Sequence, residues 1–481
     1  MTMRKASVLF LLLALVLVLV VSGWSGAIYR TRDQVELRQE ILLGDVSMVD
    51  GVGIHVRTHY DNHLFWDTTF HPGTTPTIST NYRFSAEGEQ EPWSPFYDGV
   101  RLESYMGDLS IFGQEDSPLE ETGLRQALRE LEAVTQAGQE LSRQIRLKDY
   151  MEYYPISVSF NFPQGSWSLD QMTFVDDNDL RPGRWAYDAR LLQEYFKFPV
   201  LDSERRKITI AKNANGNVYS TSLGPGDEGG DTFQLFTTGG WTDDACYFTF
   251  DALTEQGAVV DLTLLPHGFG IFRLPLNTDP DRQSPVCAEE LDMVFPLNPE
   301  VTICALDIAP EKDSLLLYTM EEGVFFLTVI DLGTMSQRQK LELITFRDQW
   351  PSYMIYENQG YIAIFFSQEN QLTVLERDDA GHYQAKINTP YQNDLAPDFQ
   401  VYDLSLDFDG SKLITAGFLP DHQYGTRETC NLRVAVFDES GMICYGEYAS
   451  SLVTGIDTSD YSYHCRQMDN NPLYVWWETS S

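Results

Sequence analysis

The sequence predicts an all-β fold, a seven-bladed β-propeller, and three observations predict it. From Tyr150 to the C-terminus, short β-branched or aromatic runs alternate with Gly, Asn and Asp turns. These turns recur about every fifty residues, a period typical of propeller blades. A separate pair of strands with period-two alternation lies far upstream, at Val52–Phe70, where it is available to complete the last blade.

The repeat can be counted from its turns. Turn centres fall at Gly165, Gly216, Gly268, Asp313, Gly360, Gly410 and Asn471. Too few residues follow Asn471 to build a four-stranded blade. We therefore expect Val52–Phe70 to pair with Leu473–Trp477 and close the ring, which removes an exposed sheet edge. Two packed β-sandwich domains are the alternative architecture.

The N-terminal segment is strongly apolar. Ala6–Tyr29 contains no charged residue and directly follows Arg4 and Lys5. A helix of about twenty apolar residues can cross a bilayer, and basic residues before it favour a cytoplasmic N-terminus. Residues 1–29 are therefore predicted to be a transmembrane signal anchor of a single-pass cell-membrane protein, with the bulk of the chain extracytoplasmic. A cleaved signal peptide is the alternative, because Ser25-Gly26-Ala27 has small residues suited to cleavage.

Four further segments follow the anchor. Residues 30–50 are predicted to be a juxtamembrane connector, residues 51–115 the β segment that closes the last blade, and residues 150–481 the propeller. Residues 116–149 are predicted to form one long amphipathic helix outside it. Ser117, Pro118 and Glu120 form a helix-start signal. The helical stripe consists of Leu124, Leu128, Leu131, Val134, Leu141 and Ile145.

Charge and cysteine usage exclude some classes of function. The net charge is −38, so the surface repels nucleic acid, and nucleic-acid binding is not expected. The remaining partners are the membrane, through the N-terminal helix, and a protein or glycan ligand. Six cysteines without a Cys-x-x-Cys pair do not form a metal framework, although up to three disulfides are compatible with export. Cys304 and Cys444 lie in strand-like runs, where a buried thiol is the competing interpretation.

A histidine cluster is the sharpest local pattern. His55, His59 and His63 recur every four residues, and Asp67 and His71 follow. If a loop at Tyr60–Asn62 joins the two strands, His59 faces His63 and His55 faces Asp67, a set that zinc accepts. The alternative is that these side chains are there by chance, facing solvent or a neighbouring blade, so whether the cluster binds metal is unknown.

Three other motifs are weak in their context. Gly224-Pro-Gly226-Asp-Glu-Gly229 matches a dinucleotide-binding fingerprint, but a strand-like run follows it and its acids repel phosphate, which predicts a loop. Asp176-Asp177-Asn178-Asp179 lacks the ligand spacing of a calcium-binding EF-hand and is interpreted as a solvated turn. Ser405-Leu-Asp407-Phe-Asp409-Gly410 approaches a sialidase Asp-box, with its glycine one place late.

Two turns carry a family resemblance. The segments DFDGSKL (Asp407–Leu413) and APEKDSLLLY (Ala309–Tyr318) resemble the blade turns of WD40-like and TolB-type propellers. The repeated Trp-Asp dipeptide of the former is missing, since Trp66-Asp67 is its single instance. The chain also resembles uncharacterised single-span bacterial membrane proteins with a large outer domain, a likeness that implies no activity.

The predicted function is a membrane-anchored extracytoplasmic propeller that acts as a binding, sensor or assembly module. No hydrolase, metalloprotease or phosphate-loop motif is present, so no catalytic or cofactor-binding residue is nominated and any cofactor is unknown. A glycan-processing hydrolase or lyase is the alternative, because its paired carboxylates cannot be recognised among 71 acids. A purely structural component is the third possibility.

Overall fold

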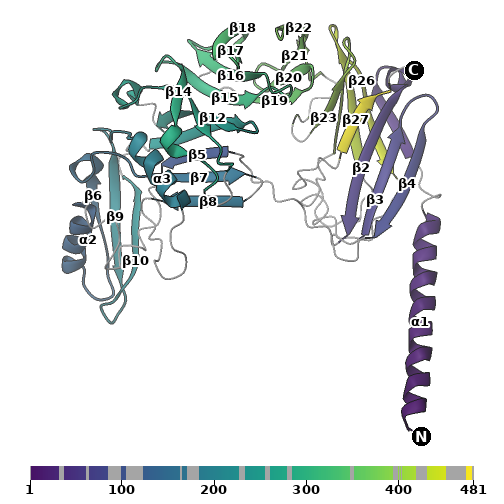
Figure 1. Cartoon of the computed structure of the whole chain (residues 1–481), viewed down its shortest axis with the longest axis horizontal. Coiled ribbons are helices and arrows are strands. Elements are labelled where there is room, and N and C mark those ends of the chain that lie inside the picture. Colours follow the sequence, from purple (N-terminus) through teal and green to yellow (C-terminus); the bar gives the residue numbers. More distant parts are fainter. Residues whose placement is uncertain are drawn as a thin grey trace. The chain divides into compact units, whose positions relative to one another are not determined.

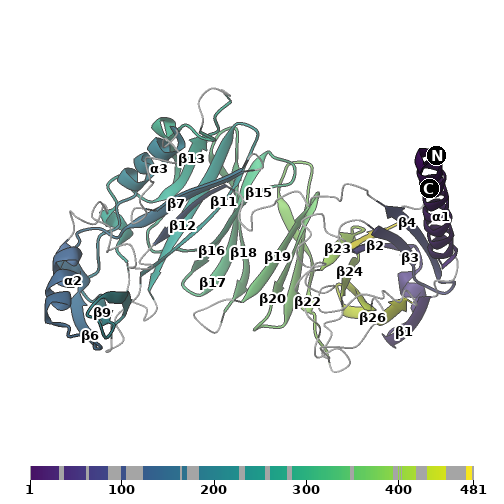
Figure 2. The same ribbon diagram turned by 90° about the horizontal axis from the view of Figure 1, so that it is seen from below.

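The computed structural model describes residues 2–31, 37–60, 64–84, 99–104, 123–162, 165–170, 184–226, 233–254, 260–278, 284–346, 352–393, 399, 401, 404–418, 431–450 and 473–478. Within them the chain is mostly β, with strands β1 to β27 in seven antiparallel sheets (Figures 1 and 2). The chain divides into two compact units: a terminal unit, Met1–Trp93 with Trp350–Ser481, and a central unit, Ser94–Gln349.

The terminal unit contains helix α1 (Thr2–Thr31), a short 3-10 helix (Val46–Val49) and three sheets. The first sheet is β27 (Leu473–Trp477), β2 (Val52–Tyr60), β3 (Leu64–His71) and β4 (Thr77–Phe84); the second is β1 (Leu37–Leu43), β26 (Gly441–Ser450), β25 (Asn431–Asp438), β24 (Leu413–Phe418) and β23 (Ser405–Phe408); the third is β19 (Tyr353–Asn358), β20 (Tyr361–Phe366), β21 (Gln371–Arg377) and β22 (Tyr383–Pro390).

The central unit contains four sheets and two helices, α2 (Gly123–Val134) and α3 (Arg184–Tyr195). Its sheets are β5 (Gly99–Ser104), β7 (Ile156–Phe162) and β8 (Gly165–Asp170); β10 (Val218–Pro225), β9 (Arg205–Lys212) and β6 (Glu140–Arg146); β11 (Phe233–Trp241), β12 (Ala245–Thr254), β13 (Gly270–Pro275) and β14 (Asp292–Pro296); and β15 (Thr302–Ile308), β16 (Ser314–Glu321), β17 (Val324–Asp331) and β18 (Ser336–Thr345). Short 3-10 turns lie at Leu147–Asp149, Leu262–Leu264 and Ala288–Glu290.

The predicted pairing between the chain's beginning and its end is confirmed. β2 pairs with β27 in antiparallel register, with Val52 opposite Trp477 and Val56 opposite Leu473. Val52, Ile54 and Val56 of β2 are buried together with Leu473 and Val475 against the neighbouring sheet. Because a one-residue slip would move this apolar set to the other face, burial fixes the register.

Neighbouring sheets are joined by hydrogen bonds between a side-chain hydroxyl of one edge strand and the backbone of the next edge strand. In the central unit, Thr237 of β11 accepts from the Leu102 amide of β5 at 2.9 Å and donates to its carbonyl at 2.8 Å. Thr238, on the other face of β11, accepts from the Leu306 amide of β15 at 3.0 Å. In the terminal unit, Ser405 of β23 accepts from the Val475 amide of β27 at 2.9 Å. Side-chain hydroxyls thus accept hydrogen bonds from amides of edge strands, which would otherwise be available to pair with a further strand.

The hairpin turns are partly those predicted. Gly216, Gly360 and Gly410 lie in the turns β9–β10, β19–β20 and β23–β24 with φ of 85°, 83° and 94°, a region that favours glycine. Asp313 lies in the β15–β16 turn. Around Gly268 the prediction of a hairpin is wrong, because Leu262–Leu264 forms a 3-10 turn rather than a strand. Gly165 begins β8, and Asn471 lies outside the described residues.

The long helix predicted over residues 116–149 is wrong in extent. The described helix, α2, spans Gly123–Val134; residues 140–146 form strand β6, and residues 116–122 lie outside the described part. Gly138, at φ 72°, ends the helical region, and burial then alternates along β6 with period two. Of the predicted stripe, Leu124, Leu128 and Leu131 are buried, whereas Val134, the last residue of α2, is 63% exposed.

Two other boundaries differ from expectation. Residues 30–50 are not only a connector, because β1 pairs with β26 as the fifth strand of its sheet. Residues 51–115 do not all join the sheet β27-β2-β3-β4, which we call the closing sheet, because β5 pairs with β7 in the central unit. The seven-bladed ring stays a prediction, since the sheet β10-β9-β6 combines strands from separate parts of the chain.

Helix α1 contains the apolar segment of residues 6–29. In the part of the chain that the structure describes, no helix has the length and hydropathy needed to cross a bilayer.

Candidate functional site

The histidine cluster lies on the closing sheet, but in a different register from the one predicted. Tyr60 pairs with Leu64, so residues 61–63 form the connection, and His59 lies opposite Phe65 rather than His63. His63 lies outside the described residues, as does the side chain of His59. Across the described residues no group of three or more His, Cys, Asp or Glu side chains is placed to hold a metal ion.

His55 nevertheless meets Asp67, as predicted, because the two are diagonal neighbours on one face of the sheet. Its Nε2 lies 3.5 Å from Asp67 Oδ1, and its Nδ1 lies 3.4 Å from the hydroxyl of Thr69, the residue directly opposite. Diagonal side chains on adjacent antiparallel strands are within reach of each other. A second imidazole–carboxylate pair joins His71 Nδ1 to Glu478 Oε1 at 3.1 Å.

Two aromatic rings lie beside these pairs. Tyr474 is opposite His55 in the β2–β27 register, and its ring centroid lies 6.3 Å from that of His55. Trp476 is opposite Gly53, and its indole meets the His71 ring edge-on at 6.4 Å. Tyr474 is 47% exposed, although it sits between the buried residues Leu473 and Val475. We call this surface the aromatic–histidine face; it consists of His55, Asp67, Thr69, His71, Tyr474, Trp476 and Glu478.

Glycine makes this arrangement sterically feasible. A Cβ placed on Gly53 would lie 2.2 Å from the Trp476 indole, far inside contact distance. Without a side chain at this position, the indole can lie across β2 and reach His71 on the far side. The signal was present in the sequence as a glycine in an otherwise regular strand, and as aromatic residues at the alternate positions of Leu473–Trp477.

The chemistry of the aromatic–histidine face suits binding. Aromatic rings offer flat apolar area with a polar edge, and imidazoles and carboxylates beside them can donate and accept hydrogen bonds. A hydroxyl, an imidazole and a carboxylate in series also resemble a nucleophile–base–orienter set. The separations of 3.4 and 3.5 Å are longer than the hydrogen bonds such a set uses in catalysis.

The Asp-box-like segment has a structural role. Besides the Ser405 contact, Asp407 Oδ2 accepts from the Trp477 amide at 2.7 Å, and Asp409 Oδ1 caps the turn by accepting from Ser411 and Lys412 amides. Asp407 therefore holds β27, and Asp409 closes the turn between β23 and β24.

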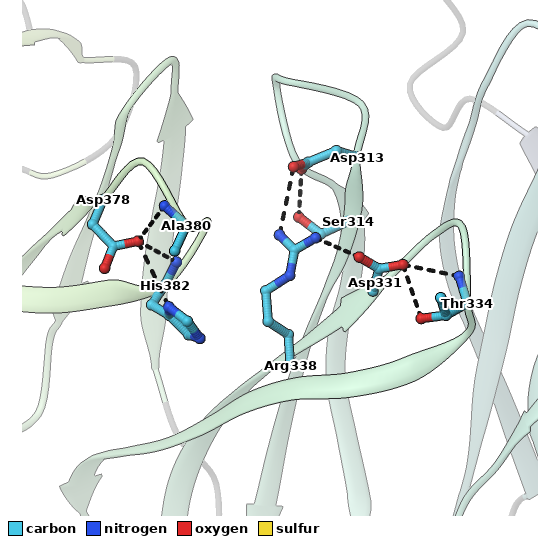
Figure 3. A network of polar contacts seen from close by, with 8 residues as sticks. All are labelled: Asp313, Ser314, Asp331, Thr334, Arg338, Asp378, Ala380 and His382. Atoms are coloured by element: carbon cyan, nitrogen blue, oxygen red, sulfur yellow. Dashed lines mark hydrogen bonds and ion pairs between the residues drawn. The ribbon is translucent and has the colours of Figure 1, made fainter.

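Figure 3 shows polar clusters that close turns. Arg338 places one nitrogen 2.5 Å from Asp331 Oδ2 and another 3.5 Å from Asp313 Oδ2. Asp331 also accepts from the amide and hydroxyl of Thr334, and the guanidinium of Arg338 is the main cause of its lowered pKa. Separately, Asp378 accepts from the amides of Ala380 and His382 at 2.9 Å, and these bonds lower its pKa. Both clusters fix turns.

Two carboxyls in the central unit have pKa values near neutrality. Burial raises the pKa of Asp251 to about 6, although its oxygens accept from the Ala252 and Ile303 amides. Burial alone raises the pKa of Asp307, on β15, to about 6. A carboxyl that stays protonated near neutral pH is a candidate general acid.

Three features of the sequence remain: the glycine motif, the acidic turn and the cysteines. The loop predicted for the glycine motif is wrong at its start, because Gly224 and Pro225 are the last residues of strand β10; residues 227–232 lie outside the described part, and strand β11 follows them. The acidic turn Asp176–Asp179 also lies outside it. Cys246 and Cys444 are buried free thiols, and burial raises their pKa to about 12 and about 11.

No family model matches the sequence, and no curated protein matches it. Similar solved structures include the periplasmic gluconolactonase PpgL of Pseudomonas aeruginosa, 10% identical, with 81% of this chain and 92% of that chain covered and a TM-score of 0.30. A putative 6-phosphogluconolactonase from Bacteroides uniformis is 10% identical over 83% of this chain and 99% of that chain, with a TM-score of 0.29. The β-propeller domain of Myceliophteria thermophila Cps50 is 9% identical over 66% and 97%, with a TM-score of 0.23.

Proposed function

We propose that this chain is a membrane-held, extracytoplasmic binding module of the β-propeller type, and that its aromatic–histidine face binds a glycan. The observation that carries the proposal is the pair of rings, Tyr474 and Trp476, flanked on one face by two imidazole–carboxylate pairs. Sugar rings present C–H groups to aromatic faces and hydroxyls to polar neighbours, so this mixture of groups matches them.

The propeller part of the proposal is supported by the order of the strands. Five of the seven sheets in the described residues have four or more strands. In these five sheets each strand lies beside its neighbour in the chain, except that β27 joins the β2–β4 sheet and β1 joins the β23–β26 sheet from the other end of the chain. Propellers repeat such sheets and close with a strand from the other terminus. The number of blades is part of the proposal, and seven is the number that the sequence repeat predicts.

A glycan array tests binding. The full chain in detergent is expected to bind a subset of glycans, and Tyr474→Ala is expected to weaken that binding by about tenfold, equivalent to 1.4 kcal/mol. The matched control is Tyr219→Ala, because Tyr219 is 68% exposed but lies on β10 in the central unit. Retention of full binding by Tyr474→Ala and His71→Ala together would refute the role of this face.

The proposed location is testable independently. The uncharged segment of residues 6–29 supports membrane attachment with the remaining chain outside. Fractionation after alkaline extraction, with protease added to intact cells, is expected to leave the chain in the membrane fraction and to cleave it from outside. A chain recovered intact in the supernatant of broken cells would contradict this.

A hydrolase or lyase acting on glycans is the second candidate. Asp307 favours it, because a half-buried carboxyl with a pKa of about 6 can donate a proton near neutral pH. Turnover of an array glycan that Asp307→Asn abolishes, with unfolding unchanged or improved, would place this candidate first.

A further inference from the structure

The sheet β10-β9-β6 and helix α2 form a module whose charge is opposite to that of the whole protein. Residues 123–150 and 201–226 contain nine Lys and Arg residues and six Asp and Glu residues, a net charge of +3. The complete chain has a net charge of −38. Such an asymmetry indicates a local attraction for anions on a molecule that otherwise repels them.

One face of this sheet is already used. Helix α2 lies against it, as Figures 1 and 2 show, and Leu124, Leu128 and Leu131 form one buried cluster with Ile208 and Ile210 of β9. On this side Arg143 reaches back to the helix, with bonds to the Ala127 carbonyl and the Glu130 carboxylate. The helix therefore leaves the other face of the sheet to present its side chains outward.

The outward face consists of four rows. Three polar rows, which we call the cationic sheet face, lie beside a fourth that contains Glu140, Ala211 and Ser220. Strand register places Ser142, Thr209 and Ser222 side by side in a hydroxyl row. The next row contains Gln144 and Lys207 with Gly224, and the last places Arg146 opposite Arg205. Ser142, Gln144, Arg146 and Ser222 are exposed.

The arginine row is electrostatically unfavourable by itself. Two like charges directly opposite each other on adjacent strands destabilise a sheet. Asp202 provides partial compensation: its Oδ1 lies 2.9 Å from Arg146 and 2.8 Å from Lys148, while Arg205 donates to the Asp202 and Glu204 carbonyls. Hydrogen bonds from Lys148 and Arg146 lower the pKa of Asp202. Asp149 Oδ1 also lies 3.7 Å from Arg146, so two carboxylates serve Arg146 and Lys148, and Arg205, whose partners are carbonyls, contributes the positive charge that remains for a further anion.

We propose that the cationic sheet face binds an acidic polysaccharide, with its carboxylates on the row of Arg146 and Arg205 and its hydroxyls on the row of Ser142, Thr209 and Ser222. Adjacent strands are spaced by about 4.8 Å and residues on one face by about 6.8 Å, a scale comparable to a sugar ring. The hydroxyl and amide rows distinguish this surface from a simple cationic patch, because they offer directional bonds that sugar hydroxyls can satisfy. This site is separate from the aromatic–histidine face and lies in the other unit.

The probe is polygalacturonate, with dextran as the uncharged glycan, and the assay is equilibrium binding to the full chain in detergent. Polygalacturonate is expected to bind and dextran not to bind, and affinity is expected to fall with added salt. The double variant Arg146→Gln, Lys207→Gln should weaken binding by about tenfold. The control Lys386→Gln removes one exposed cation that pairs with Glu376 in the terminal unit, and its binding should stay within about twofold.

A second variant separates sugar recognition from charge. Ser142→Ala, Ser222→Ala keeps every charge and is expected to weaken polygalacturonate binding by about threefold while leaving binding of inorganic polyphosphate unchanged. Circular dichroism checks that both variants fold. The proposal is overturned if the full chain does not bind polygalacturonate, if Lys386→Gln loses as much affinity as the double variant, or if polyphosphate or phosphatidylserine vesicles bind at least as tightly as polygalacturonate.

Discussion

The indole of Trp476 occupies the space beside Gly53 that the Cβ of any other residue would need. This contact joins the last strand of the chain to the first strand of the closing sheet, and it also positions one ring of the aromatic–histidine face. Stability and binding are therefore linked at a single glycine.

Gly53→Ala is expected to destabilise the terminal unit. The added Cβ would lie 2.2 Å from the indole, so Trp476 must move or β27 must shift, at a cost of about 1–3 kcal/mol. Urea unfolding measures this cost, and glycan binding should weaken in parallel. Gly224→Ala is the control: nothing lies within 4 Å of its Cβ, so stability should change by less than about 0.5 kcal/mol. Equal effects of the two substitutions would contradict the packing argument.

The attachment of β27 is expected to depend on two side chains of the neighbouring sheet. Ser405→Ala and Asp407→Ala each remove the acceptor of a β27 amide, that of Val475 or that of Trp477, at a cost of about 1–3 kcal/mol each. Hydrogen exchange of these two amides should accelerate, and unfolding in urea should begin earlier. Ser411→Ala is the control, because its exposed hydroxyl donates to Asp409 and not to β27 within the described residues. Unchanged protection of the β27 amides would show that the pairing with β2 alone holds the strand.

The sequence predicted the β2–β27 pairing because the last repeat is too short to form a sheet of four strands, and the alternating segment Val52–Phe70 could complete it. It did not predict the partner of His59. A three-residue connection between β2 and β3 can begin at residue 61 instead of residue 60, and the same side chains still point to the same face of the sheet. It predicted the buried stripe of α2 but carried the helix too far, since Leu141 and Ile145 fit both a helical spacing and the alternation of a strand. Short apolar patterns of this kind do not distinguish a helix from a strand.

The candidate site was harder to predict than the fold. The histidines indicated a site on β2 and β3. The rings that complete the aromatic–histidine face come from β27, more than 400 residues later in the chain. Only the closing pairing brings Tyr474 next to His55. The cationic sheet face depends in the same way on β6 and β9, which pair across the intervening strands β7 and β8.

The pH dependence of stability is expected to contain a contribution from Asp307. Burial raises its pKa from 3.8 to about 6, so the folded state binds the proton more tightly than the unfolded chain. The stabilisation that follows is fully present below about pH 4 and is lost as the pH rises through about 6, by at most about 3 kcal/mol. Asp307→Asn should therefore be more stable than the parent above pH 6 and equal to it near pH 4. Thermal unfolding across this range measures both; a variant less stable at neutral pH would mean that the carboxylate has a stabilising partner.

A buried ion pair in the central unit is expected to be the most sensitive polar contact to single substitution. Glu204 is fully buried; it accepts a hydrogen bond from the Tyr154 hydroxyl and another from Arg206 Nε at 2.6 Å. Glu204→Ala leaves the Arg206 guanidinium buried without its counter-charge, which costs about 3–5 kcal/mol. Tyr154→Phe is the matched comparison, because it removes one hydroxyl and leaves the ion pair intact, at a cost of about 1–3 kcal/mol. Unfolding in urea ranks the two variants, and a larger loss for Tyr154→Phe would show that the hydroxyl, rather than the charge pair, holds β9 against its neighbours.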